Sequence, residues 1–264
     1  MVNDAFLKLV EITKRLRAEC PWDREQTHES IRMSLIEEAY EVVEAIDGRA
    51  HDDLRKELGD LLLHVLFHSN IAEERHEFTL EEVITGLTEK LIFRHPHVFG
   101  DVKVGNAHEV KQNWEKLKMQ EGRTSLMDGV PKELPALLRA HRLQDKASKA
   151  GFDWEKREDV WKKVEEELGE LHREVGDQAG PEAGHTSGEA NRERMEMEFG
   201  DLLFALVNYA RFLHVNPEIA LRGTIEKFIA RFQYIERRLK ETGKDVHSST
   251  LGEMDALWRE AKQV

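Results

Sequence analysis

The pattern of hydrophobic and polar positions along the chain is helical almost throughout. Apolar residues recur at the three- and four-residue spacing of an α-helix with one buried face, and no alternating strand pattern stands out. The pattern therefore predicts an all-α fold. The expected helices cover about 3–19, 27–47, 51–75, 79–93, 107–120, 133–149, 157–176, 189–213, 216–241 and 251–262.

Three segments between these helices have the composition of loops. Residues 95–106 are punctuated by Pro and Gly, and residues 176–188 are rich in Gly with few apolar side chains. We expect the second of these segments to be a mobile surface insertion. Residues 121–135, EGRTSLMDGVPKELP, are expected to form a linker.

Similar blocks of sequence recur in the same order in the two halves of the chain. Such a fixed order indicates a duplication. We therefore expect two tandem helical-bundle domains, at 1–120 and 136–264, separated by the linker at 121–135. The paired blocks are RAECPWD (17–23) with SKAGFDW (148–154), KELGDLLLHVLF (56–67) with MEFGDLLFALVN (197–208), EKLIFR (89–94) with EKFIAR (226–231), and EVKQNWEKLK (109–118) with EMDALWREAK (253–262).

Each half carries two adjacent glutamates, a third glutamate three residues later, and then a Glu-x-x-Asp pair on the next expected helix. Residues three apart on a helix share a face, so each half offers two helices that each carry a carboxylate pair. The members are Glu37, Glu38, Glu41, Glu57 and Asp60 in the first half and Glu166, Glu167, Glu170, Glu198 and Asp201 in the second.

These acids have two interpretations, because a chain with 52 acidic residues also places such pairs on solvated helix faces by chance. Three observations favour a site. No basic residue follows Glu166 until Arg173, although like charges at this spacing repel. Asp60 and Asp201 begin apolar stretches that should be buried, where an unpaired carboxylate is costly. The set also occurs twice.

The candidate ligands are all oxygen atoms. No Cys or His falls at the matching positions, which disfavours zinc and copper, whereas carboxylates suit Mg²⁺ or Mn²⁺. A di-iron centre is the alternative in a helical bundle, and it needs Glu-x-x-His on two helices. The nearest match, Glu25 with His28, lies outside the repeated helices.

The net charge and the cysteine content indicate which classes of partner and which cellular compartment to expect. The net charge of −13 repels a phosphate backbone, so we expect no nucleic-acid partner. The single cysteine, Cys20, forms no internal disulfide, which suits a reducing cytosol. Apolar runs such as LLFALV (202–207) are far shorter than the roughly 20 residues that cross a bilayer. We expect a cytoplasmic protein without a membrane partner.

Glu-Glu-x-x-Glu followed by Glu-x-x-Asp, each on a helix, resembles the MazG-type nucleoside triphosphate pyrophosphohydrolases of the all-α NTP pyrophosphatase group. The resemblance implies a tandem-domain all-α protein that forms a homodimer. It also implies Mg²⁺-dependent hydrolysis of NTPs and dNTPs to the monophosphate and pyrophosphate. Further matching segments are CPWDREQTH (20–28), RHPHVFG (94–100), LPALLRAHRLQDKA (134–147), GFDW (151–154) and both GDLL blocks.

The resemblance also assigns roles to individual residues. Glu166 would lie beside the nucleotide and help to position the attacking water, and Trp258 would contact the nucleotide. Arg194 stands where the family can carry Lys, which changes the hydrogen-bond geometry. The implied metal ligands are Glu167, Glu170, Glu198 and Asp201, with Glu38, Glu41, Glu57 and Asp60 in the first half. The implied phosphate or nucleotide contacts are Lys163, Arg194, Lys227 and Arg231.

The two halves differ in their basic residues. Lys90 and Arg94 match Lys227 and Arg231, but Ser34 stands at the position of Lys163 and Asp53 at that of Arg194. We therefore expect the second half to be the principal catalytic half.

Two other functions stay open, a narrow-specificity dNTP or modified-nucleotide pyrophosphatase and a non-catalytic metal-binding regulatory module. Trp154 could stack on a base or serve only in packing. We expect His64 and His68 to be core or interface histidines.

Overall fold

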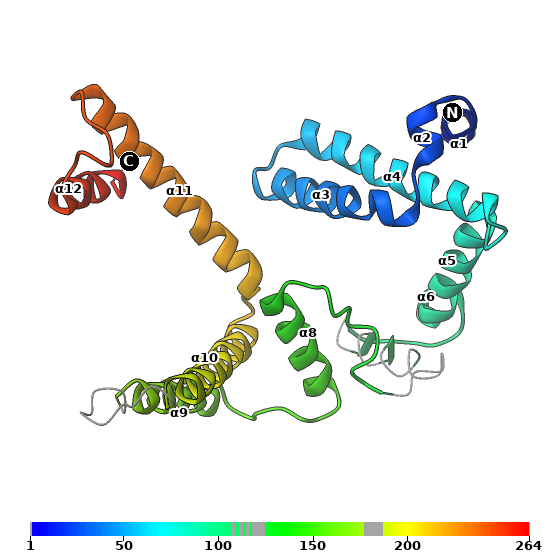
Figure 1. Cartoon of the computed structure of the whole chain (residues 1–264). Helices are drawn as coiled ribbons and strands as arrows, with labels where there is room; N and C mark the ends of the chain where they lie inside the picture. Colours follow the sequence, from blue (N-terminus) through cyan, green and yellow to red (C-terminus); the bar gives the residue numbers. More distant parts are fainter. Residues whose placement is uncertain are drawn as a thin grey trace. The chain divides into compact units, whose positions relative to one another are not determined.

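In the computed structural model the chain is a series of helices that divides into two units, Met1–Val110 and Lys111–Val264 (Figure 1). The structure describes residues 2–106, 109–110, 113–114, 117, 125–176 and 187–263. The predicted helix at 107–120, the linker at 121–135 and the Gly-rich segment at 176–188 lie partly outside these residues. The linker and the mobility of the Gly-rich segment therefore stay predictions.

Two long helices form a hairpin in the first unit. α3 (His28–Asp47) and α4 (His51–Glu74) lie side by side, joined by a turn in which Arg49 has a φ of 54°. The Thr27 side chain caps α3 by accepting a hydrogen bond from the backbone N–H of Ser30. The apolar core between the two helices contains Ile31, Leu63, Phe67 and Ile71.

Further helices contact α4: α1 and α5 pack on it, while α2 packs on α1 and α6 on α5. The packing of α1 on α4 depends on Arg17, which is buried and pairs with Glu74. The same guanidinium donates to the carbonyl oxygens of Asp23 and Gln26. These further helices are α1 (Val2–Glu19), α2 (Pro21–Glu25), α5 (Leu80–Arg94) and α6 (Pro96–Phe99).

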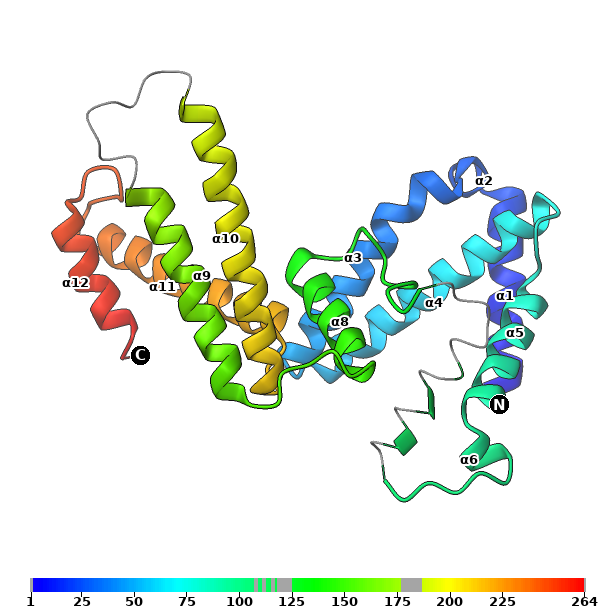
Figure 2. The same ribbon diagram turned by 90° about the horizontal axis from the view of Figure 1, so that it is seen from below.

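The second unit repeats the hairpin with two helices of similar length. α9 (Arg157–Gly176) and α10 (Ser187–Phe212) lie side by side, and α8 (Ala136–Lys149) packs against α10 (Figure 2). α11 (Pro217–Glu241) contacts α8 and α10 and packs along α12 (Leu251–Ala261). The hairpin therefore holds the acidic residues of this half on two adjacent helices.

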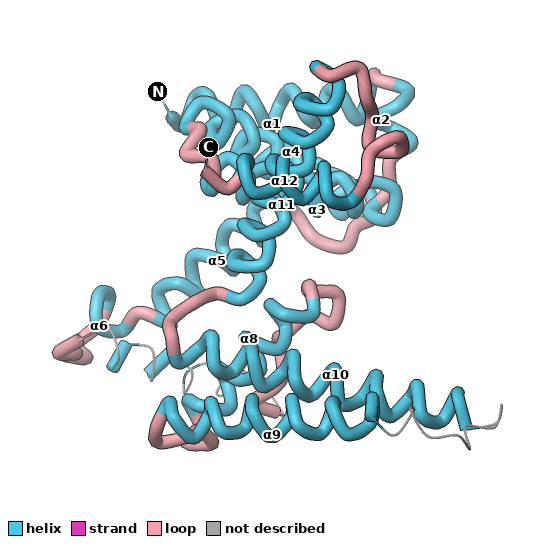
Figure 3. The backbone as a smooth tube through the Cα atoms, turned by 90° about the vertical axis from the view of Figure 1, so that its left-hand side faces the viewer, coloured by secondary structure: helices cyan, strands magenta, loops and turns pink. Residues whose placement is uncertain are grey.

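The described residues contain helices and loops but no strand (Figure 3), so the predicted all-α fold is confirmed. The prediction of a loop at 95–106 was wrong in part, because α6 is a short helix within it, and α2 is a further short helix that the pattern did not predict. Both begin with a proline, whose fixed φ suits the first position of a helix. α8 begins at Ala136, later than predicted, because Pro135 occupies its N-cap. No described helix is both long and apolar enough to span a membrane.

Candidate active site

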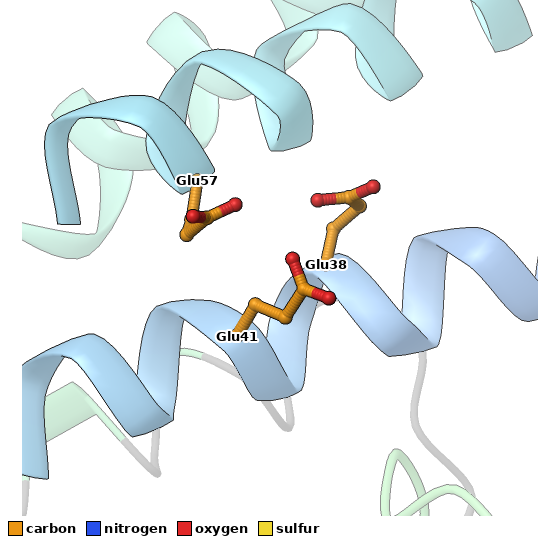
Figure 4. Close-up of side chains that lie close together, drawn as sticks. All are labelled: Glu38, Glu41 and Glu57. Carbon is orange, nitrogen blue, oxygen red and sulfur yellow. The ribbon is translucent and has the colours of Figure 1, made fainter. Parts of the chain in front are cut away.

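Three acids of the first unit meet between α3 and α4. Glu38 and Glu41 lie one turn apart on α3, and Glu57 faces them from α4 (Figure 4). One carboxylate oxygen from each of the three lies within 4.8 Å of the other two. We call these residues the N-terminal acid cluster. Asp60 lies outside this group, but its charge adds to burial in raising the pKa of Glu38.

Three acids of the second unit meet in the same way between α9 and α10. Glu167 is buried on α9, and Glu198 and Asp201 face it from α10, again with one oxygen of each within 4.8 Å of the others. We call these residues the C-terminal acid cluster. Glu170 is not part of this group, and its carboxylate accepts a hydrogen bond of 3.2 Å from Arg173.

Burial and mutual repulsion disfavour charge in both clusters. Burial raises the pKa of Glu198, and the charges of Glu170, Asp201 and Glu167 raise it further. The pKa of Glu57 is raised in the same way, by burial and then by Glu41. A bound cation removes this repulsion.

Lys163 supplies a positive charge beside the C-terminal acid cluster. Its ammonium lies 2.7 Å from a carboxylate oxygen of Glu166 and 2.7 Å from one of Glu167. Hydrogen bonds to these two glutamates raise the pKa of Lys163, so it stays protonated. Glu166 itself is exposed to solvent.

Arg194 pairs with two residues that are not members of the C-terminal acid cluster. Its Nε donates to Glu174 on α9 at 3.0 Å, and its Nη2 donates to Asn191 at 3.2 Å. Arg194 therefore has a partner on the neighbouring helix that was not predicted. Its role as a phosphate contact stays a prediction.

The remaining predicted contacts gather on α11 and α12. The guanidinium of Arg231 lies 5.6 Å from the centre of the Trp258 ring, and the Phe228 ring lies 5.3 Å from the same indole. Lys227 lies one turn before Arg231 on α11. The structure thus brings Arg231 and Trp258 together.

A cavity of about 730 Å³ opens beside the C-terminal acid cluster. Glu167, Asp201 and Lys163 line one part of its wall. Apolar side chains of α8 and α10 line much of the rest, among them Leu143, Ala147, Phe204 and Ala205. Lys227, Arg231 and Trp258 are not among the lining residues. A volume of this size is typical of a small-molecule site.

Several polar residues of the cavity wall were not predicted as site residues. Asn208 and Arg211 lie on α10 beyond Asp201, and Asp153 pairs with Arg211 from the loop after α8. Polar side chains at these positions interrupt the apolar stretch DLLFALVNYAR at spacings of seven and ten residues from Asp201. This interruption of the apolar pattern is the sequence feature from which these wall residues could have been predicted. Trp154 also lines the cavity and is about half exposed.

The donor set of each cluster fits a divalent metal ion. Three carboxylates converge, and burial together with their mutual repulsion raises the pKa of Glu198 and of Glu57. No His or Cys belongs to either cluster, so oxygen-preferring ions such as Mg²⁺ and Mn²⁺ suit the ligands. Which ion binds, and whether Glu170 and Asp60 join its ligands, stay predictions.

One family model matches the sequence in both halves. The family is described as the MazG nucleotide pyrophosphohydrolase domain, and the matches cover residues 26–99 and 155–235. Both acid clusters lie inside these ranges.

Relatives are similar over nearly the whole chain. The nucleoside triphosphate pyrophosphohydrolase/pyrophosphatase MazG of Thermotoga maritima is 45% identical, over 97% of this chain and 95% of that protein. The nucleoside triphosphate pyrophosphohydrolase of Escherichia coli is 39% identical, over 97% and 96%. The uncharacterized protein YabN of Bacillus subtilis is 49% identical, over 92% of this chain and 48% of its own length. The crystal structure of a MazG-related protein from Thermotoga maritima matches 42% of this chain and 97% of its own, with 29% identity and a TM-score of 0.39.

Proposed function

Because the chain belongs to the MazG nucleotide pyrophosphohydrolase family and is an enzyme of that class, we propose that it hydrolyses NTPs and dNTPs to the monophosphate and pyrophosphate. The observation that carries the proposal is the position of Glu167 and Asp201 on the wall of a cavity of about 730 Å³. Glu198 lies beside these two acids in the C-terminal acid cluster. Carboxylates at this wall would hold a cation where a triphosphate can reach it. The rest of the wall is mostly apolar and accepts many bases.

The proposed cofactor is Mg²⁺, with Mn²⁺ as a substitute. When bound, the ion neutralises triphosphate charge and polarises the water that attacks the α-phosphorus. Glu167, Glu170, Glu198 and Asp201 are the proposed ligands. Glu166 is exposed one residue before Glu167, from where it can orient that water by accepting a hydrogen bond.

Lys163 is the proposed contact to the leaving pyrophosphate. Its ammonium is held between Glu166 and Glu167. If Glu167 coordinated a cation, Lys163 would be free to turn toward a phosphate. Positioning and electrostatic stabilisation of this kind dominate phosphoryl chemistry.

We further propose that the second half is the principal catalytic half. The first half retains an acid cluster but has Ser34 where the second half has Lys163. Ser34 carries no positive charge, and its hydroxyl donates a hydrogen bond to the carbonyl oxygen of Ile31. The matched test compares Glu167→Ala with Glu38→Ala. We expect the first variant to lose turnover and the second to keep most of it, and an equal loss in both would contradict this assignment.

We propose a cytoplasmic homodimer without a nucleic-acid or membrane partner. The group formed by Arg231, Phe228 and Trp258 supports a dimer, because it is partly exposed on α11 and α12 and does not line the cavity of its own unit. A second copy could place this group against the triphosphate. Light scattering at several protein concentrations measures the oligomeric state.

One assay separates the proposed activity from the alternatives. The protein is incubated with Mg²⁺ and each NTP and dNTP in turn, and the products are identified by ion-exchange chromatography. Monophosphate and pyrophosphate from most nucleotides support the proposal, whereas turnover of one nucleotide alone supports a narrow-specificity enzyme. Diphosphate and phosphate would contradict attack at the α-phosphorus. No turnover would favour the metal-binding regulatory module.

A further inference from the structure

The side-chain amide of Asn208 is fixed in one orientation on the cavity wall. Its Oδ1 accepts hydrogen bonds from Arg211, at 3.2 Å from Nε and 2.9 Å from Nη2. Arg211 is itself held by Asp153, whose carboxylate accepts from both terminal nitrogens of the guanidinium. Because a guanidinium only donates, the oxygen of Asn208 must face it.

The amide nitrogen of Asn208 is therefore the group left for another molecule. Nδ2 donates to no residue within the part of the chain that the structure describes. Asn208 is half-buried and lines the cavity. A molecule in the cavity thus meets a hydrogen-bond donor at this point of the wall.

Asn208 lies at a defined distance from the acidic part of the cavity. It follows Asp201 by seven residues, which is two helical turns, so the two side chains share one face of α10. Seven residues advance the helix by about 10 Å. Phe204 and Ala205 line the cavity between them. The span matches the reach of a nucleotide from the α-phosphorus across the sugar to the base.

We propose that Asn208 is a base-binding residue whose Nδ2 donates a hydrogen bond to the nucleobase while the triphosphate lies at the C-terminal acid cluster. The inference rests on the proposed function and adds the residue that holds the base. Each common base carries a carbonyl oxygen or an unprotonated ring nitrogen, so a single donor serves all of them. Arg211 is a positioning residue, because it fixes which end of the amide is offered.

The first half lacks this contact. In the repeated block, Phe67 occupies the position of Asn208 and His64 that of Ala205. Phe67 is buried against Ile31 and Ile71 and carries no donor. A base-binding role for Asn208 therefore agrees with catalysis in the second half.

The test separates base binding from triphosphate binding. Asn208→Asp keeps the shape and the pairing with Arg211 but replaces the donor by a carboxylate oxygen, and Asn208→Ser provides a second variant. KM and kcat are measured for ATP, GTP, CTP and UTP. Ribose 5-triphosphate, which has no base, is tested as a competitive inhibitor of the same reactions. The matched control is Asn216→Asp, because Asn216 is the N-cap of α11 and aspartate caps equally well.

We expect Asn208→Asp to raise KM for the four nucleotides about tenfold or more, with kcat little changed. The inhibition constant of ribose 5-triphosphate should stay within about twofold of the wild-type value, since no base contact is lost. Arg211→Lys should raise KM by a smaller factor and also spare ribose 5-triphosphate. Asn216→Asp should change neither constant.

An equal loss of affinity for nucleotides and for ribose 5-triphosphate would overturn the proposal, because it would indicate a general structural role. Unchanged KM values in both Asn208 variants would overturn it as well. A wild-type protein that hydrolyses no nucleotide would instead refute the proposed function, and the wild-type measurement detects this before any variant is examined.

Discussion

The ammonium of Lys163 lies 2.7 Å from Glu167, the buried member of the C-terminal acid cluster, and 2.7 Å from the exposed Glu166. One positive charge therefore serves two adjacent carboxylates at the wall of the cavity. The first half has no equivalent, since Ser34 stands at that position. This relationship makes Lys163 the residue that most clearly distinguishes the two halves.

Lys163→Ala is expected to lower kcat/KM for NTP hydrolysis by roughly ten- to a hundredfold, the usual cost of losing a hydrogen bond to a charged group. The neighbouring Lys162 supplies the control, because it is exposed and pairs with Asp159 at 2.8 Å outside the cavity. Lys162→Ala should leave kcat/KM within about twofold of the wild-type value. Similar losses in both variants would show that the local charge, and not the contact to Glu167, matters.

The raised pKa of Glu198 predicts a link between pH and cation binding. The pKa of Glu198 is higher in the folded than in the unfolded protein, so the folded protein binds more protons at pH values between the two. The protein therefore loses stability as the pH rises through this range. Without divalent cations, Glu198→Gln should therefore gain stability over the wild type at about pH 7.5 and less at about pH 5. Added Mg²⁺ should raise the Tm of the wild type more than that of the variant.

Thermal unfolding in EDTA and in Mg²⁺ measures these differences. Glu196→Gln provides the control, because Glu196 is exposed on the same helix and pairs with Arg192 at 3.0 Å. A Mg²⁺-induced change in Tm that is equal in Glu198→Gln and in the wild type would exclude Glu198 from the cation site.

Two histidines of the first unit predict acid sensitivity. The Nδ1 atoms of His28 and His68 lie 2.7 Å apart, so one must carry a proton and the other must accept it. Burial, followed by the charges of His28 and His64, lowers the pKa of His68. The neutral form is thus favoured in the fold, and stability is lost as pH falls below the ordinary value of about 6.5.

The loss of unfolding free energy between about pH 7.5 and about pH 5.5 should be smaller in His68→Phe than in the wild type. Urea unfolding at the two pH values measures it. His51→Gln is the control, since His51 is exposed at the first position of α4. If His68→Phe lost as much stability as the wild type over this range, the histidine pair would not be the cause.

Among the charged residues of the first unit, Arg17 is expected to lower the free energy of unfolding most when it is substituted. Arg17→Met removes its bonds to Glu74, Asp23 and Gln26 and should lower the free energy of unfolding by roughly 3 kcal/mol. Arg15→Met should cost less than about 0.5 kcal/mol, because Arg15 is exposed and, among the described residues, pairs with Glu19 alone. Chemical denaturation of the two variants provides the comparison.

The helices and the acid pairs could be predicted from sequence because both follow from helical periodicity. Glu167 and Asp201 meet because α9 and α10 lie side by side and each carboxylate lies on the side of its helix that faces the other. Asp201 is exposed, however, so the expected burial of its apolar stretch was wrong. The family resemblance, drawn from the same acids, is confirmed by the family match at 26–99 and 155–235. Local spacing was sufficient for these features.

The cavity could not be predicted in this way, because its wall is assembled from separate elements. Trp154 comes from a loop, Leu143 from α8 and Asn208 from α10. Arg194 shows the same limit, since its partner Glu174 belongs to another helix, 20 residues away in sequence. Periodicity defines the face on which a side chain lies but not the neighbour with which it pairs.

The ion pair between Asp153 and Arg211 has a mechanical consequence. It fastens the loop that carries Trp154 to α10, the helix that also carries Glu198 and Asp201. The loop at the rim of the cavity and the acids at its wall are therefore both attached to α10, so bending this helix would move both. A ligand that contacts both the loop and the acids would restrict bending of α10 and slow the exchange of its amide hydrogens with solvent.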